Sequence, residues 1–117
     1  MYKSSTELAR HIERESSFII NSCQNYTFEL FYSDEILKRA VVRALEIVGE
    51  AAKKIDKEFK QKHSHIEWIN IVGLRNRLIH DYEGTDYDIV WEVIQDDIPE
   101  LHFQITEILN NSIGDML

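Results

Sequence analysis

Residues 37–55 read LKRAVVRALEIVGEAAKKI, and this stretch decides the fold. Its apolar side chains recur at alternating steps of four and three residues, a spacing that places them along one face of a helix. The members of this seam are Leu37, Val41, Ala44, Val48, Ala51 and Ile55. We expect one helix from Ser33 to Lys60, about 42 Å long at 1.5 Å per residue, that packs against other helices.

Helical periodicity continues on both sides of this stretch. A first helix is expected over residues 5–23, where Leu8, Ile12, Ile19 and Cys23 share a face. A third helix is expected to begin at a Ser64–Glu67 capping box and to end near residue 81. Thr85 is expected to cap a fourth helix, which Pro99 either kinks or separates from a fifth by lying in the first turn of that helix.

The same pattern contains no convincing strand. With four glycines and one proline among 117 residues, turns are few, which favours long helices over many short strands. The predicted fold is therefore all-α, an antiparallel helical bundle of four to five helices. The length predicts a single domain spanning residues 1–117.

Composition narrows the class of protein. Hydrophobic residues make up 44% of the chain and charged residues 29%, which is ordinary for a globular protein. Cys23 is the one cysteine, so an internal disulfide is excluded and a reducing compartment is indicated. The first residues show no signal-peptide pattern, and no apolar run approaches the roughly 20 residues that span a bilayer. We expect a cytoplasmic protein.

Charge is distributed unevenly along the chain. The formal net charge is −8, but all 13 Lys and Arg lie at or before Arg77, and ten acids follow it. The acidic C-terminal part is interpreted first as a solvated surface and second as a docking face for a basic partner. Five lysines between residues 53 and 62 suit the C-terminal end of the predicted second helix. They are also compatible with an RNA-binding patch.

The densest chemistry lies in GLRNRLIHDY, residues 73–82. An arginine can hold an anionic phosphate through its fork of donors, which makes Arg75 and Arg77 candidates for phosphate binding. His80 can move a proton near neutral pH. Asn76 can orient a histidine or donate to a phosphate oxygen. These residue types together are suited to cleavage of a phosphodiester.

Helical geometry predicts how these side chains meet. On a continuous helix, Asn76 and His80 share a face, because they are four residues apart. Arg75 and His80 are five apart, roughly 140° around the axis, so they do not meet unless the helix unwinds or a second chain supplies one of them. This mismatch suggests a composite site in a homodimer. The structural alternative is that the arginines and His80 only form ion pairs with acids such as Asp81.

The segment RNRLIHDY, residues 75–82, resembles the Arg-x4-His-x-Tyr signature of HepT-like proteins in the HEPN superfamily of helical ribonucleases. The resemblance covers roughly residues 36–110. Its flanking segments are RALEIVGEAA at 43–52, WINIVGL at 68–74, DYDIVW at 86–91 and DIPEL at 97–101.

This resemblance implies a metal-independent endoribonuclease toxin of a toxin–antitoxin pair that needs no cofactor and acts as a homodimer. It implies that Arg75 and His80 are catalytic and that Asn76 and Arg77 support them. The implied partner is a small nucleotidyltransferase antitoxin of the MNT type, which would neutralise the toxin by adding adenylyl groups to Tyr82. The competing hypothesis is a non-catalytic helical module that binds and assists a nucleotidyltransferase.

Other residues have simpler interpretations. A metal site at His63, His65 and Glu67 is disfavoured, because no second cluster of ligands accompanies them. Gly49 within a helix suggests a close approach of another helix, and Glu50 is either a buried acid paired with an arginine or a solvated one. We expect Trp68 and Trp91 to be anchors in the core or at an interface, and Cys23 to be a small buried hydrophobe. His11 and His102 are expected on helix surfaces.

Overall fold

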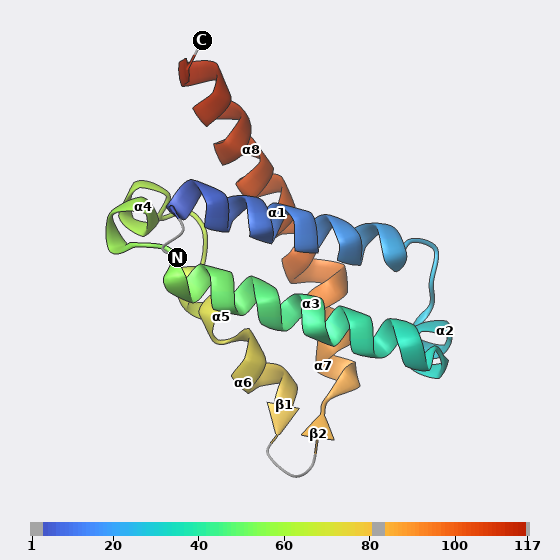
Figure 1. Ribbon diagram of the computed structural model, residues 1–117. Coiled ribbons are helices and arrows are strands. Elements are labelled where there is room, and N and C mark those ends of the chain that lie inside the picture. The colour runs from blue at the N-terminus through green and yellow to red at the C-terminus, as the bar shows by residue number, and fades with distance from the viewer. Residues whose placement is uncertain (1–3, 81–83, 117) are drawn as a thin grey trace.

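The computed structural model describes the backbone of residues 4–80 and 84–116 and the side chains of residues 4–79 and 84–111. Within these ranges the chain is almost entirely helical (Figure 1). Its elements are α1 (Ser5–Ser22), α2 (Phe28–Ser33), α3 (Glu35–Lys54), α4 (Lys57–Lys62), α5 (Trp68–Val72), α6 (Leu74–Leu78), β1 (Ile79–His80), β2 (Gly84–Thr85), α7 (Tyr87–Glu92), the π-helical segment η2 (Val93–Asp97) and α8 (Ile98–Met116).

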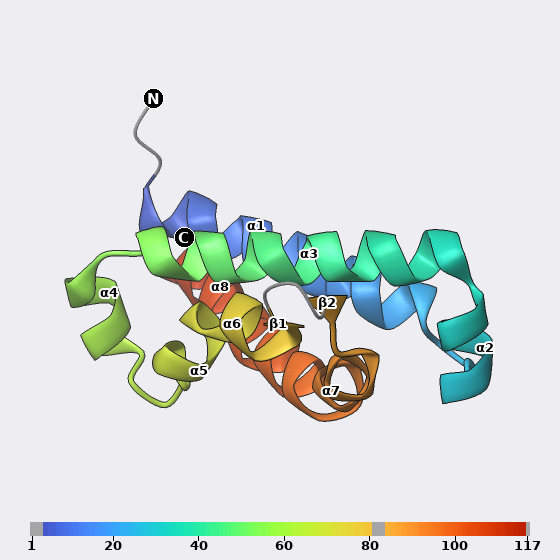
Figure 2. The same ribbon diagram turned by 90° about the horizontal axis from the view of Figure 1, so that it is seen from below.

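The helices form two layers. The long helices α1 and α3 run antiparallel to each other along one layer (Figure 1). Helices α5 to α8 make up the second layer, which covers the inner faces of α1 and α3 (Figure 2). Helix α8 crosses α1 and extends beyond it, so the C-terminus lies outside the two layers (Figure 1). The predicted all-α helical architecture is confirmed.

The core lies between the two layers and consists largely of the apolar side chains that the helical periodicity predicts to be buried. Five of the six residues of the predicted α3 seam are buried, and Leu37 is half-buried. The predicted face of α1 is buried as well. Fully buried side chains from both layers include Ile12, Ile19, Leu45, Val48, Leu78, Val90, Ile98 and Ile105. Burial of these apolar side chains is the main force that holds the layers together.

The second predicted helix is shorter than expected. It is preceded by a separate short helix, α2, and is capped by Asp34, whose side chain accepts a hydrogen bond from the Leu37 backbone at 2.9 Å. It ends at Lys54, because Ile55 turns to extended backbone and is buried. Asp56 then caps α4 by accepting from the Phe59 backbone at 2.8 Å. A buried side chain and a cap, rather than glycine or proline, therefore end α3.

The third predicted helix is also divided. The expected Ser64–Glu67 capping box does not form, because α5 begins only at Trp68 and its N-cap Glu67 makes no side-chain capping bond. The Glu67 carboxylate instead accepts from the side chain of Asn70. Gly73 separates α5 from α6, and α6 ends at Leu78.

The chain after α6 contains two short strands that the sequence pattern did not predict. Strands β1 and β2 pair antiparallel, with Ile79 opposite Thr85 and His80 opposite Gly84. Gly84 has a φ of +86°, a left-handed conformation that favours glycine. Asp86, rather than Thr85, caps α7. Pro99 lies in the first turn of α8, which is the second of its two predicted positions.

Three packing predictions are confirmed. A Cβ atom at Gly49 would lie 3.3 Å from the backbone oxygen of Ile71, so this glycine does allow α5 to approach α3 closely. Trp68 is buried, with its indole N–H donating to the His63 carbonyl at 3.1 Å. Burial raises the pKa of the Cys23 thiol to about 11 by desolvation, which keeps it a neutral, buried side chain.

In the described part of the chain, no helix combines the length and the apolar character needed to cross a bilayer.

Candidate functional site

Helix α6 presents Arg75, Asn76 and Arg77 to solvent, because Leu74 and Leu78 turn its other face into the core. Residues two apart on a helix point in directions that differ by about 200°. The two arginines accordingly contact different neighbours. Arg75 contacts α3, whereas Arg77 contacts the last residue of η2.

Arg75 is held loosely by a carboxylate on α3. Its Nε lies 3.8 Å from Glu46 Oε2, and 64% of the Arg75 side chain is exposed to solvent. An ion pair this long and this exposed contributes little to folding, typically about 0–1 kcal/mol. The contact orients the guanidinium while leaving it accessible to an incoming phosphate, which would compete with Glu46 for it.

His80 does not lie on the helix that carries the arginines. Helix α6 ends at Leu78, Ile79 has extended backbone dihedrals, and His80 is the last residue of β1. The expectation that Asn76 and His80 share one helical face is therefore wrong. The predicted 140° separation of Arg75 and His80 also assumed a continuous helix, so it no longer argues for a composite site.

Two residues of the motif lie outside the described part of the chain. These are Asp81, considered as an ion-pair partner, and Tyr82, considered as the site of modification. The backbone on either side of them is paired, because His80 lies opposite Gly84. The amide of Asp86 also donates to the carbonyl of Leu78 at 2.7 Å.

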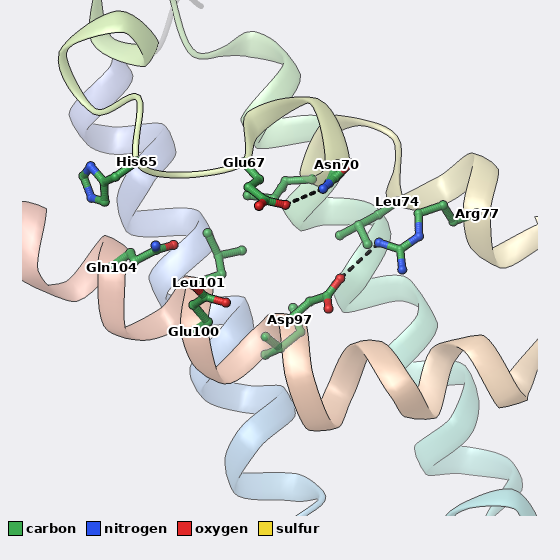
Figure 3. Close-up of a pocket in the computed structure, with 11 residues that line it drawn as sticks. His65, Glu67, Asn70, Leu74, Arg77, Asp97, Glu100, Leu101 and Gln104 are labelled. Carbon is green, nitrogen blue, oxygen red and sulfur yellow. Dashed lines mark hydrogen bonds and ion pairs between the residues drawn. The ribbon is translucent and has the colours of Figure 1, made fainter.

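Arg77 faces a pocket between α5–α6 and the start of α8. Its Nη1 donates to Asp97 Oδ2 at 3.0 Å, and Figure 3 shows the two side chains meeting across the gap between their helices. The pocket has a volume of about 430 Å³. Its polar lining residues are His65, Glu67, Asn70, Arg77, Asp97, Glu100 and Gln104.

Charge decides what this pocket can hold. Three carboxylates face one arginine, and that arginine is already paired with Asp97. A phosphate would be repelled by this lining, whereas neutral or cationic groups that donate hydrogen bonds would be accommodated. Arg75, on the other side of α6, is the more accessible of the two arginines, with 64% of its side chain exposed against 41% for Arg77.

His63 and His65, together with Glu67, are the candidate metal ligands that the sequence offers. Their rings lie 6.2 Å apart, and His63 packs on Phe59 with a centroid distance of 4.6 Å. The pKa of His63 lies below its ordinary value, mainly because burial disfavours the imidazolium and further because Lys62 and His65 are close. Among the described residues, no group of three or more His, Cys, Asp or Glu is arranged to hold a metal ion.

His102 is not the surface residue that the sequence suggested. Its Nδ1 lies 2.9 Å from Oγ of Ser16, which is fully buried. Ser16 Oγ also donates to the Glu13 carbonyl, so Nδ1 of His102 is assigned as the donor to Ser16. This pair ties α8 to α1 and lies away from the arginines of α6.

Sequence reasoning missed two acids that orient the motif. Glu46 rather than Glu50 pairs with Arg75, while Glu50 is exposed and pairs with Arg43 at 3.6 Å. The available signal was that Glu46 lies one turn before Gly49, where the α5 backbone lies close to α3. Asp97 pairs with Arg77 across 20 positions of sequence, and no local pattern indicates this contact.

The amino-acid sequence was also compared with known families and proteins. A sequence model of the family described as "Ribonuclease HepT-like" matches residues 8–108. The chain is 50% identical over 99 residues to "Putative RNase TTE0752" of Caldanaerobacter subterraneus subsp. tengcongensis, covering 85% of this chain and 88% of that protein. It is 40% identical over 95 residues to "Probable ribonuclease HepT" of Thermococcus cleftensis, covering 81% and 83% respectively. No solved structure matches significantly.

Proposed function

This chain belongs to the HepT-like ribonuclease family, and from that premise we propose that it is a metal-independent endoribonuclease that acts as the toxin of a toxin–antitoxin pair. Residues 1–117 would form one catalytic domain. The observation that carries the proposal is the exposed Arg75, oriented by Glu46, on the short helix α6, whose C-terminal end leads directly into the strand that contains His80.

RNA carries its own nucleophile, the 2′-hydroxyl. In the proposed reaction, a base removes the 2′-proton, O2′ attacks the adjacent phosphorus, and the bond from phosphorus to O5′ breaks. An acid then protonates the leaving O5′. The products are a 2′,3′-cyclic phosphate and a 5′-hydroxyl end, and no water or metal enters this transesterification.

Arg75 would stabilise the charge that develops on the phosphoryl oxygens. Its guanidinium is exposed, and its contact with Glu46 is long enough to be exchanged for a phosphate. His80 would serve in proton transfer, since an imidazole titrates near neutral pH. Asn76, exposed on the same helix as Arg75, would donate to a phosphate oxygen, and Arg77 would brace α6 against η2 through Asp97.

A homodimer would allow two copies of His80 to divide the roles of base and acid. Support for the dimer comes from the resemblance to HEPN proteins, whose motifs face each other across a twofold axis. The angular argument from a continuous helix no longer supports it, because α6 ends before His80.

Cleavage is expected to continue in excess EDTA. The mechanism takes its charge stabilisation from Arg75 and its proton transfers from His80, so a chelator removes nothing that it needs. The measurement is cleavage of a labelled RNA by the purified, partner-free protein, with the ends of the products identified chemically. Loss of cleavage in EDTA that added Mg²⁺ or Mn²⁺ restores would contradict this mechanism.

Tyr82 is proposed as the control point for an MNT-type nucleotidyltransferase antitoxin. An adenylyl group would turn a neutral phenol into a bulky anion two residues from His80, where it would compete with RNA for Arg75. Tyr82→Phe is therefore expected to retain ribonuclease activity and to escape neutralisation by the partner. Mass spectrometry of the protein co-expressed with its antitoxin tests this.

The control for the Tyr82 experiment is Tyr87→Phe, which removes a phenol from α7, after the motif. Adenylylation should persist in that variant. If wild-type protein is fully neutralised while Tyr82 stays unmodified, the antitoxin works by binding alone. Its docking face would then be the exposed acids of α7, η2 and α8, such as Glu92, Asp96 and Glu100.

A further inference from the structure

The densest cluster of positive charge in this acidic protein lies where α3 ends and α4 follows. Residues 53–62 contain five lysines and two acids on a chain whose net charge is −8. We define the lysine platform as Lys53, Lys54, Lys57, Lys60 and Lys62. It spans the last turn of α3 and the whole of α4.

The structure weakens the simplest explanation for this cluster. On a single helix, all five lysines would suit the negative C-terminal end of the helix dipole. Because α3 ends at Lys54, only Lys53 and Lys54 occupy the last turn of a long helix. Lys57 lies at the first position of α4, where the dipole disfavours a cation, and α4 has only six residues. Lys60 and Lys62 do lie in the last turn of α4, so helix electrostatics suits four of the lysines, two at the end of each helix, and leaves Lys57 unexplained.

The lysines are also available for an external anion. Four of the five are exposed and Lys60 is half-buried. Among the ion pairs formed within the described residues, none involves a lysine of the platform. Of the two interspersed acids, Asp56 is engaged as the cap of α4. With Asp56 and Glu58 counted against the five lysines, residues 53–62 keep a formal charge of +3 (5 − 2) that no ion pair in the described part of the chain engages.

The platform begins on the same helix as the acid that orients Arg75, because Lys53 and Lys54 lie on α3 with Glu46. Lys53 follows Glu46 by seven residues, which is nearly two full turns and a rise of about 11 Å, so the two positions share a face of α3. Between them lies Glu50, whose charge is balanced by Arg43 at 3.6 Å. Helix α4 lies beyond the C-terminal end of α3, and α5 and α6 lie beneath the adjoining half of α3 (Figure 2). The platform and Arg75 can therefore contact one bound strand.

We propose that the lysine platform anchors the backbone of single-stranded RNA while the scissile phosphate lies at Arg75. This inference rests on the proposed ribonuclease function and names the part of the substrate that this surface holds. Lysines act as point charges on phosphates, without selecting a base sequence. The platform would therefore add affinity for long RNA and leave the chemical step unchanged.

The test compares two double variants with equal charge. Lys53→Gln/Lys57→Gln removes two charges from the platform, and Arg14→Gln/Arg39→Gln removes two exposed charges elsewhere on α1 and α3. The probe is a labelled RNA longer than about 16 nucleotides, fully 2′-O-methylated so that it cannot be cleaved. Fluorescence anisotropy at several salt concentrations gives Kd and its salt dependence.

The platform variant is expected to bind about 10-fold more weakly at 0.1 M salt, with the slope of log Kd against log salt reduced by about 1.4. The arginine variant should stay within about 2-fold of wild type. Lys53→Arg/Lys57→Arg should restore binding. On long cleavable RNA, the platform variant should show a raised KM with an unchanged kcat.

Three results would overturn the proposal. They are equal losses in both double variants, unchanged RNA binding by the platform variant, and a loss of affinity for polyglutamate without a loss for RNA, which would assign the surface to an acidic protein. Failure of the wild-type protein to cleave any RNA would instead remove the proposed function while leaving the binding result to stand by itself.

Discussion

Replacing His80 by alanine is expected to reduce RNA cleavage by roughly 10³- to 10⁴-fold, and Arg75→Ala by roughly 10²- to 10³-fold. The larger loss reflects proton transfer by His80, which would serve as base and acid in the two halves of a dimer. The smaller loss reflects stabilisation of the phosphoryl oxygens by one guanidinium. Initial rates on a labelled RNA, measured below and above KM, separate these effects on kcat from effects on binding.

The matched control is Arg39→Ala. Arg39 is also an exposed helical arginine, and it pairs with Glu35 at 3.6 Å much as Arg75 pairs with Glu46. It lies near the start of α3, away from the motif, so its loss should leave cleavage unchanged. The melting temperature of Arg75→Ala should also stay close to that of wild type, because the Arg75 ion pair is largely exposed. Wild-type cleavage by either motif variant would show that the substituted residue is not catalytic.

Gly49→Leu is expected to lower the free energy of unfolding by about 2 kcal/mol, which corresponds to a decrease in Tm of roughly 10 °C. A Cβ at this position would lie 3.3 Å from the Ile71 backbone oxygen and 3.9 Å from Leu74 Cβ. A leucine side chain would therefore push α5 and α6 away from α3. That displacement separates Arg75 from Glu46, so cleavage should fall as well.

Gly49→Ala separates the two contributions. Alanine adds only the Cβ, and its better helix propensity, about 1 kcal/mol, offsets the tight contact with the Ile71 oxygen. This variant should unfold within about 1 kcal/mol of wild type and retain most of its activity. Thermal unfolding and RNA cleavage are measured on both variants. A leucine variant as stable as the alanine variant would show that the approach of α3 to α5 is not tightly packed.

The helical class, the buried faces and the position of the motif could be predicted from local pattern. The seam of α3 and the apolar face of α1 were correctly identified, because periodic burial is encoded within a few turns of a helix. Gly49 was recognised as a point of close approach, since a glycine inside a helix has a cost that packing must offset. The resemblance that identified the family also came from residues close together in the chain.

Helix ends were less predictable. Where two neighbouring residues can both act as the N-cap, the packing of the surrounding structure determines which of them does. Asp34 was preferred to Ser33, and Asp86 to Thr85, although each pair contains two acceptable caps. The long second helix was expected to continue to Lys60, and it stops because Ile55 is drawn into the core. No glycine or proline near Ile55 indicates that the helix ends there.

The sequence by itself determined the all-α class, the family and the residues of the motif. Only the tertiary structure decided that Arg75 meets Glu46, that Arg77 meets Asp97 across a pocket, and that His80 lies in a strand. The two arginine contacts join residues 20 or more positions apart, so they depend on how the helices pack and not on any local pattern. Packing of Leu78 into the core and pairing of His80 with Gly84 end the helix before the histidine.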